Sequence, residues 1–191
     1  VWFGGDAPIT TSSLLEITTR YTPESTGEIL LGFAGVGTGR VYVVNSGGNT
    51  VSEFAPGVTS AAGPDVTIAG SNTGLSNPTG IALDAAGRIY VTSQSSASVS
   101  VFAAGANGNA APIATISGTN TGLSGPASAT VNSAGDLWVA NAGNNSLTEY
   151  APGANGNVAP IATVTGAATD LNSPVGIGQD EHGNLLVANL Y

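Results

Sequence analysis

Apolar and polar residues alternate over short stretches of this chain, and turn-forming sequences separate the stretches. Segment 79–84 has apolar residues at alternate positions, and segment 88–93 is rich in β-branched and aromatic residues. Segments 98–103 and 112–117 continue with the same period of two. Such alternation is typical of β-strands. The pattern therefore predicts four consecutive short strands between residues 78 and 124.

The links between these predicted strands are polar and suited to hairpins. In DAAG (84–87), the Asp can cap its own backbone and the Gly can adopt a positive φ. SQSSA (93–97) predicts a bend, while 104–111 and 118–126 predict loops. No stretch of ten or more residues has the apolar spacing of an amphipathic helix. We therefore expect an antiparallel sheet and exclude a helical solenoid.

The four-strand unit recurs with a constant period of 48 residues. The recurring positions include Gly39, Gly87, Gly135 and Gly183; Pro64, Pro112 and Pro160; and Phe54, Phe102 and Tyr150. A fixed period indicates one supersecondary unit used several times. A single four-stranded sheet would expose apolar residues on both faces, so the copies must stack face to face. The sequence thus predicts an all-β fold, a β-propeller of four-stranded antiparallel blades.

The repeat divides residues 1–191 into modules of a single propeller domain or part of one. The approximate modules are a divergent and incomplete 1–30, then 31–77, 78–125, 126–173 and an incomplete 174–191. Five segments match the second strand of a blade, at 1–4, 40–44, 88–92, 136–140 and 184–188. This count favours a four-module slice of a larger ring of six or more blades. In the competing register, the two termini complete one blade of a closed four-bladed ring.

Few residues are charged, and acidic ones dominate. The chain has no Lys, three Arg (Arg20, Arg40 and Arg88) and a net charge of −9. This charge opposes binding to nucleic acid and to anionic membranes. No apolar run approaches 18 residues, so we expect no membrane insertion. A surface rich in Ser, Thr, Asn and Gly without Lys favours an extracellular, periplasmic or cell-surface location.

Three pieces of the chain resemble NHL-type repeats. They are GRVYVVNSGGNTVSEFA (39–55), GIALDAAGRIYVTSQSSASVSVFA (80–103) and GDLWVANAGNNSLTEYA (135–151). The resemblance implies a β-propeller, usually of six blades. The family's usual Asp after the second strand is replaced here by Asn45, Ser93, Asn141 and Asn189, and its third-strand Arg is missing. A site built on that Asp and Arg therefore lacks support.

The opening segment VWFGGDAPITTSSLLEI (1–17) is similar to the repeat of streptogramin-lyase-like propellers. The activity of that family uses a histidine and a divalent cation, as the resemblance implies. No residue of this chain matches that pattern. His182, the one histidine, lies in a DEHG turn that reads DAAG or NSAG in other modules. The sequence therefore predicts an exposed turn residue at His182 and assigns no catalytic residue.

Asparagines gather at one predicted rim of the propeller and form the main candidate binding site. They are Asn45, Asn49, Asn72, Asn120, Asn141 and Asn145. As a group they could present a polar surface to a glycan or a protein. The alternative is structural, because Asn tolerates the left-handed region and caps turns.

Asp84 and Asp180 occupy equivalent hairpin turns and are the candidate metal ligands. Carboxylate oxygens suit Ca²⁺, although no loop here has the alternating acidic ligands of a dedicated calcium site. Turn capping explains each Asp equally well. We predict no other cofactor. Arg40 and Arg88, which precede second strands, are expected to be solvated edge residues.

One position in each second strand carries an aromatic residue: Trp2, Tyr42, Tyr90 and Trp138. Because this position alternates with apolar neighbours, we expect packing between adjacent blades, with stacking on sugars as the alternative.

Three functions fit the sequence. The favoured one is a non-enzymatic extracytoplasmic propeller that binds a protein or glycan, or serves as a scaffold. The second is a lyase- or hydrolase-type enzyme with a divalent cation. The third is a self-assembling structural protein that associates through open blade edges.

Overall fold

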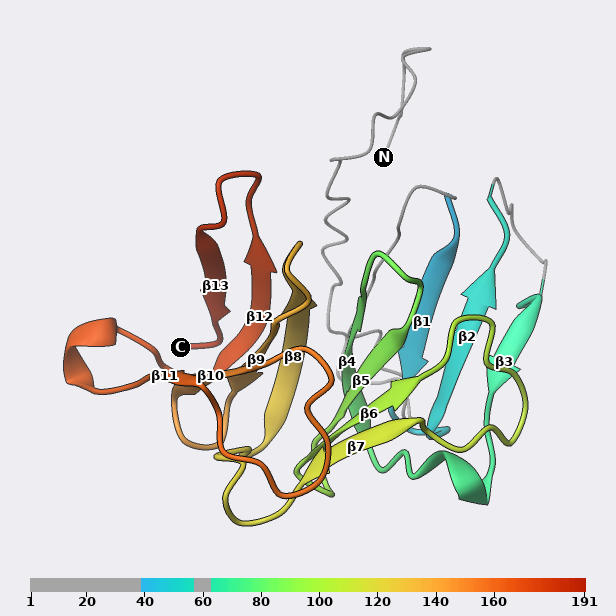
Figure 1. Ribbon diagram of the computed structural model, residues 1–191, viewed down its shortest axis with the longest axis horizontal. Coiled ribbons are helices and arrows are strands. Elements are labelled where there is room, and N and C mark those ends of the chain that lie inside the picture. Colours follow the sequence, from blue (N-terminus) through green and yellow to red (C-terminus); the bar gives the residue numbers. More distant parts are fainter. Residues whose placement is uncertain (1–38, 57–62) are drawn as a thin grey trace.

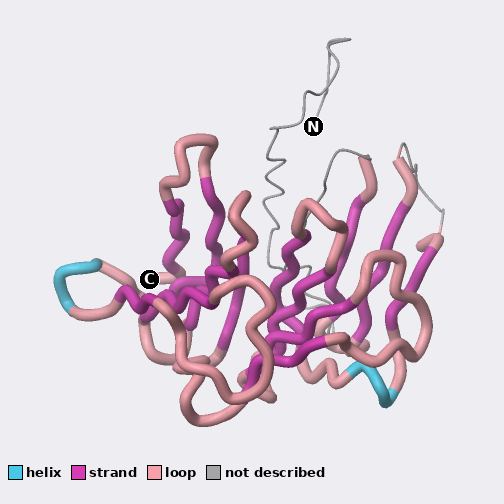
Figure 2. The backbone as a smooth tube through the Cα atoms, viewed as in Figure 1, coloured by secondary structure: helices cyan, strands magenta, loops and turns pink. Residues whose placement is uncertain are grey.

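The computed structural model describes residues 39–56 and 63–191 (Figure 1). Strands and loops make up this part, with two short 3-10 turns, η1 (Ser71–Thr73) and η2 (Ala167–Thr169) (Figure 2). The predicted module 1–30 and the segment 1–17 lie outside the described residues, as do Arg20 and Trp2.

The strands form four antiparallel sheets, which we call blades 1 to 4 in chain order. Blade 1 contains β1 (Val41–Asn45), β2 (Thr50–Phe54) and β3 (Val66–Ile68). Blade 2 contains β4 (Pro78–Leu83), β5 (Ile89–Ser93), β6 (Ser98–Phe102) and β7 (Ala114–Ser117). Blade 3 contains β8 (Pro126–Val131), β9 (Leu137–Asn141), β10 (Ser146–Tyr150) and β11 (Ala162–Val164). Blade 4 contains β12 (Pro174–Gln179) and β13 (Leu185–Asn189).

Within each blade, the strands lie beside one another in chain order, as hairpin links require. The predicted four-strand unit is confirmed in blades 2 and 3, with strand ends that differ by one or two residues. The fourth strand of blade 2 begins at Ala114 and not at the predicted residue 112, where Pro112 has no N–H to donate.

The blades pack face to face in an open arc (Figure 1). First strands β4, β8 and β12 contact one another in turn, so they mark the inner side of the arc. The described sheets do not close into a four-bladed ring. The competing register would pair the N-terminal segment with a strand of another module, and that segment lies outside the described residues.

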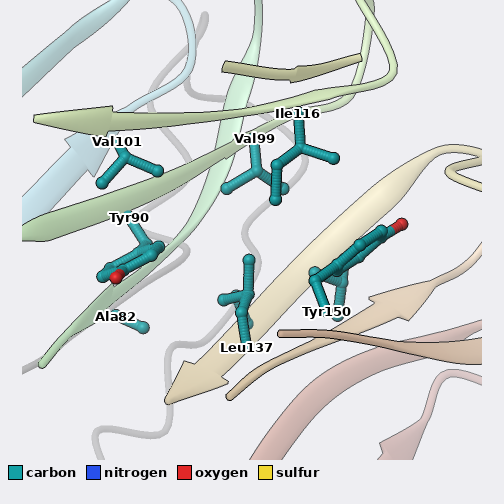
Figure 3. Close-up of a cluster of buried hydrophobic side chains, with 9 residues drawn as sticks. Ala82, Tyr90, Val99, Val101, Ile116, Leu137 and Tyr150 are labelled. Carbon is teal, nitrogen blue, oxygen red and sulfur yellow. The ribbon is translucent and has the colours of Figure 1, made fainter. Parts of the chain in front are cut away.

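The core lies between the blades. One cluster joins blades 1 and 2 and contains Val44, Val51, Ile68, Ile81, Ile89, Val91 and Phe102. A second cluster joins blades 2 and 3 and contains Ala82, Tyr90, Val99, Val101, Ile116, Ala129, Leu137, Val139 and Tyr150 (Figure 3). Successive residues of a strand point to opposite faces, so neighbours such as Ile89 and Tyr90 serve different clusters. Each blade therefore covers apolar side chains that the facing surface of its neighbour would otherwise expose to solvent.

Inner strands β4 and β8 approach each other closely at Gly80. A Cβ at this position would lie 2.7 Å from the carbonyl oxygen of Ala127 and from Cα of Ser128. Next to it, the Thr79 hydroxyl donates a 2.7 Å hydrogen bond to the Pro126 carbonyl. The absent side chain thus lets the two blades come together on the inner side of the arc.

Candidate functional site

Asn45 and Asn141 end second strands, and their side-chain amides bond within their own blade or, for Asn141, also to the connection that enters it. Asn141 is fully buried; its Nδ2 donates to Thr148 Oγ1 at 3.0 Å, and its Oδ1 accepts from the Ser124 amide at 3.2 Å. The Nδ2 of Asn45 donates to the Thr50 and Ser52 hydroxyls at 3.0 and 3.1 Å. Both side chains therefore fix the geometry of the bend that follows them.

Asn49 and Asn145 link consecutive blades. Both have a positive φ, 52° and 53°, at the end of the bend after the second strand. The Asn49 Oδ1 accepts from the backbone amide of Asn77, and the Asn145 Oδ1 accepts from that of Ser173, each at 2.7 Å. Each bond crosses from one bend to the connection that enters the next blade. The side-chain oxygens are thus engaged in the scaffold.

Asn72 and Asn120 take part in a second kind of inter-blade bond, which the sequence pattern does not predict. Their backbone amides donate to the Oδ1 atoms of Asn109 and Asn157, at 2.7 and 2.8 Å. Asn109 and Asn157 belong to the long loops after the third strands of blades 2 and 3. The 48-residue step between them was the available signal, but a loop location hid their role.

The same long loops pair with the outer strand of the preceding blade. Gly108 forms an isolated parallel bridge with Ile68, and Gly156 forms one with Ile116. The Gly108 amide donates to the Thr67 carbonyl at 2.8 Å. The sequence ANGN at 106–109 and 154–157 therefore joins each of these loops to the outer strand of the preceding blade.

Asp84 is a turn cap with an ion pair. Its Oδ1 accepts from the amides of Ala86 and Arg88 at 3.0 and 2.9 Å, and its Oδ2 accepts from Arg88 Nε. The Tyr90 hydroxyl donates to the same Oδ2 at 3.2 Å. Burial raises the pKa of Asp84, but the bonds from Arg88 and Tyr90 outweigh burial and leave that pKa below its ordinary value.

Asp180 occupies the equivalent turn of blade 4, and its side chain is one-third exposed. Its Oδ1 accepts from the amides of His182 and Asn184 at 2.9 and 2.8 Å. Bonds from the Asn184 side chain and amide lower the pKa of Asp180. The His182 side chain is 75% exposed, with Nδ1 4.0 Å from Asp180 Oδ2, as expected for a turn residue.

The two candidate metal ligands stand in turns of different blades, each surrounded by N–H donors. Within residues 39–56 and 63–191, no three His, Cys, Asp or Glu side chains gather closely enough to hold a metal ion.

The polar pair in the first turn changes from blade to blade. Blade 2 pairs Asp84 with Arg88, whereas blade 3 places Asn132 and Asp136 at these positions, with Nδ2 2.9 Å from Oδ2. Arg40 of blade 1 pairs instead with Glu53 of the neighbouring strand. The prediction that Arg40 and Arg88 are solvated edge residues was therefore incomplete, because each is anchored by a largely buried carboxylate.

Tyr90 confirms the expected packing between blades, because it is 5% exposed and lies in the cluster with Leu137 and Val139 (Figure 3). Tyr42 packs, partly buried, against the cluster between blades 1 and 2.

A cavity of about 230 Å³ opens between blades 2 and 3 beside this cluster. Arg88, Tyr90 and Asn155 contribute polar groups to its wall, and Val101 and Leu137 contribute apolar ones. The sequence does not predict this cavity, because a void depends on how two sheet faces fit together.

No family model matches this chain, and no curated protein matches it. Several solved structures do. Hydrazine synthase from Kuenenia stuttgartiensis is similar at 14% identity and a TM-score of 0.63, over 89% of this chain and 46% of that one. A protein from Lactobacillus plantarum is similar at 14% identity and a TM-score of 0.58, over 86% of this chain and 50% of that one. A streptogramin B lyase is similar at 17% identity and a TM-score of 0.50, over 87% of this chain and 70% of that one.

The fold is that of a β-propeller. The arrangement of the blades and the similarity to propeller structures agree on this, and identities of 14–17% show the fold alone. The propeller chain spans about half the length of the hydrazine synthase and Lactobacillus plantarum chains that it resembles. In the part of the propeller that the structure describes, no helix is long and apolar enough to cross a bilayer.

Proposed function

We propose that this chain is a non-enzymatic, extracytoplasmic β-propeller of the NHL-repeat type, which scaffolds and binds a neutral glycan. The engagement of the repeated polar residues carries the proposal. The side chains of Asn45, Asn49, Asn141 and Asn145 bond within and between blades and give the propeller a fixed rim. A fixed rim presents a preorganised surface to a partner.

The exposed groups of this rim suit an uncharged polar partner. Its bends are SGGN (46–49), QSSA (94–97) and AGNN (142–145), which carry amides and hydroxyls and no ionisable side chain. Such groups donate and accept hydrogen bonds, as the hydroxyls of a sugar require. A net charge of −9 also disfavours polyanionic partners such as acidic polysaccharides. A glycan is therefore preferred here, with a protein as the other partner class.

A glycan array probed with the full chain tests this proposal. Ser95→Arg places a long cation in the exposed bend of blade 2 and should abolish binding to any neutral glycan that the wild type retains. Ala85→Arg makes the same change in the exposed turn at the opposite end of this blade and should leave binding intact. Absence of binding to all glycans, or equal binding by both variants, would refute the proposed rim site.

The enzyme alternative, a lyase or hydrolase with a divalent cation, draws on fold similarity to a streptogramin B lyase. Asp84 and Asp180 are the residues that it would use. Calorimetric titration with Ca²⁺ separates the two proposals. Saturable heat that Asp180→Asn removes would favour the metal-dependent alternative.

Self-association is a further candidate, favoured by exposed apolar side chains in and near β13. Leu186 and Leu190 are 56% and 58% exposed. Light scattering across a concentration series tests this, and a monomer throughout would contradict it. Leu186→Ser should shift any oligomer toward monomer.

A further inference from the structure

The wall of the cavity between blades 2 and 3 is mostly apolar and includes one cationic side chain, Arg88. Val101, Ile116 and Leu137 contribute apolar wall, and Arg88 lies among the lining residues. Ile113 also lines it and is 57% exposed, which marks the side open to solvent. Ile113 thus adds apolar surface at the opening, in keeping with ligand sites that are concave and mostly apolar.

The equivalent place between blades 1 and 2 is built differently and provides an internal comparison. Glu53 and Asp65 stand at the repeat positions of Val101 and Ile113. Glu53 pairs with Arg40, and Asp65 lies 3.7 Å from the same guanidinium. In blade 1 the arginine therefore meets two carboxylates on its own blade. In blade 2 two aliphatic residues replace these carboxylates, and the arginine faces an apolar cavity.

Arg88 keeps donors for a ligand. Its Nε bonds to Asp84 Oδ2, and the guanidinium makes no other hydrogen bond to a described residue. A guanidinium has five N–H donors, so the terminal nitrogens still have four. Carboxylates are the acceptors that match this group best. Asn155 adds a side-chain amide to the wall, with its Oδ1 already engaged by the Thr115 amide.

We propose that this cavity binds a small monocarboxylate with an apolar body, held by Arg88 at its charged end. The volume supports this class, since an apolar cavity of roughly 150 Å³ suffices for benzene and this one has about 230 Å³. The site lies between blades, and it does not depend on the proposed rim function. Phenylacetate is a suitable probe, and phenylacetamide is its uncharged counterpart.

Methyl NMR titration of the full chain tests the proposal. Phenylacetate should shift the Ile113 and Leu137 methyl signals in a saturable manner, and bind at least tenfold more tightly than phenylacetamide. Arg88→Gln should reduce this preference to about twofold or less. Arg40→Gln, at the equivalent position of blade 1, should leave it unchanged. Absence of saturable shifts, or the same preference in Arg88→Gln, would overturn the proposal.

Arg88→Gln also removes the Arg88–Asp84 ion pair and so affects the stability of the blade. A second variant therefore tests the cavity with this pair intact. Ala154 lines the cavity and is only partly buried, so Ala154→Leu should fill the space in a folded protein. We expect at least tenfold weaker binding of both probes. Unchanged phenylacetate affinity in a folded Ala154→Leu variant would place the probe elsewhere and overturn the proposal.

Discussion

The hydroxyl of Tyr150, on the third strand of blade 3, donates a 2.5 Å hydrogen bond to the backbone carbonyl of Thr121. Both residues are fully buried, and Thr121 belongs to the connection between blades 2 and 3. In blades 1 and 2 the same repeat position carries Phe54 and Phe102, which have no hydroxyl. This polar link is thus an addition to an apolar position.

We expect Tyr150→Phe to lower the free energy of unfolding by about 1–2 kcal/mol, because the buried Thr121 carbonyl loses its donor. Urea denaturation measures this. Tyr191→Phe is the control. Tyr191 is 84% exposed, so loss of its hydroxyl should change the free energy of unfolding by about 0.5 kcal/mol at most. Equal stability of Tyr150→Phe and wild type would show that the link contributes nothing net.

Gly80→Ala should separate the inner strands of blades 2 and 3. The new methyl would meet the Ala127 carbonyl and the Ser128 backbone at 2.7 Å, and we expect a loss of about 1–3 kcal/mol. Thermal unfolding measures this. Gly178→Ala in β12 is the matched control, because nothing lies within 4 Å of its added Cβ. An equal effect of both substitutions would refute the close-approach argument.

Asn145 should tolerate Asp better than Gly. Asn145→Gly permits the positive φ but removes the acceptor for the Ser173 amide, so we expect a loss of about 0.5–1 kcal/mol. Asn145→Asp keeps an acceptor oxygen and should remain near wild type. Denaturant midpoints distinguish the two. If Gly matched wild type while Asp did not, the inter-blade bond would not stabilise the propeller.

The Asp84 carboxylate should stabilise the propeller in a pH-dependent way. Its folded pKa lies below the ordinary value, so the folded state binds fewer protons than the unfolded state in the acid range. This stabilisation is complete above the ordinary pKa of about 4 and is lost as pH falls through the lower folded pKa. Asp84→Asn should flatten the acid end of the stability profile, as measured by unfolding between pH 2 and 7.

A double substitution provides the control for Asp84. Asp84→Asn alone leaves Arg88 without its carboxylate, at a cost of about 2 kcal/mol near neutral pH. Adding Arg88→Asp recreates the pair that blade 3 forms between Asn132 and Asp136. We expect the double variant to recover part of the loss. Strict additivity of the two changes would show that the residues do not act as a pair.

Glu149 should show the opposite pH dependence. Burial and the Asp136 charge raise the pKa of Glu149 in the folded state. The free energy of unfolding therefore falls as pH rises from the ordinary pKa of a glutamate to this raised pKa. Glu149→Gln should therefore increase the melting temperature at pH 7 and have less effect at pH 4. A loss of stability at pH 7 would contradict this reasoning.

The chain itself determined the blade and its repetition. Alternation in segments such as 88–93 assigns strands, DAAG (84–87) assigns a turn, and the 48-residue step requires copies that stack. These features are local or periodic, so they can be predicted without coordinates. The capping of Asp84 and Asp180 was predictable for the same reason, because a turn Asp bonds to amides two to four residues away.

Only the tertiary structure decided what happens between blades. It placed Asn109 against Asn72 and Gly108 against Ile68, which are contacts between residues 37 and 40 positions apart in different modules. It also left a cavity where Val101 replaces the carboxylate of Glu53. Such contacts depend on how two complete sheets fit together, which no periodicity within one strand records.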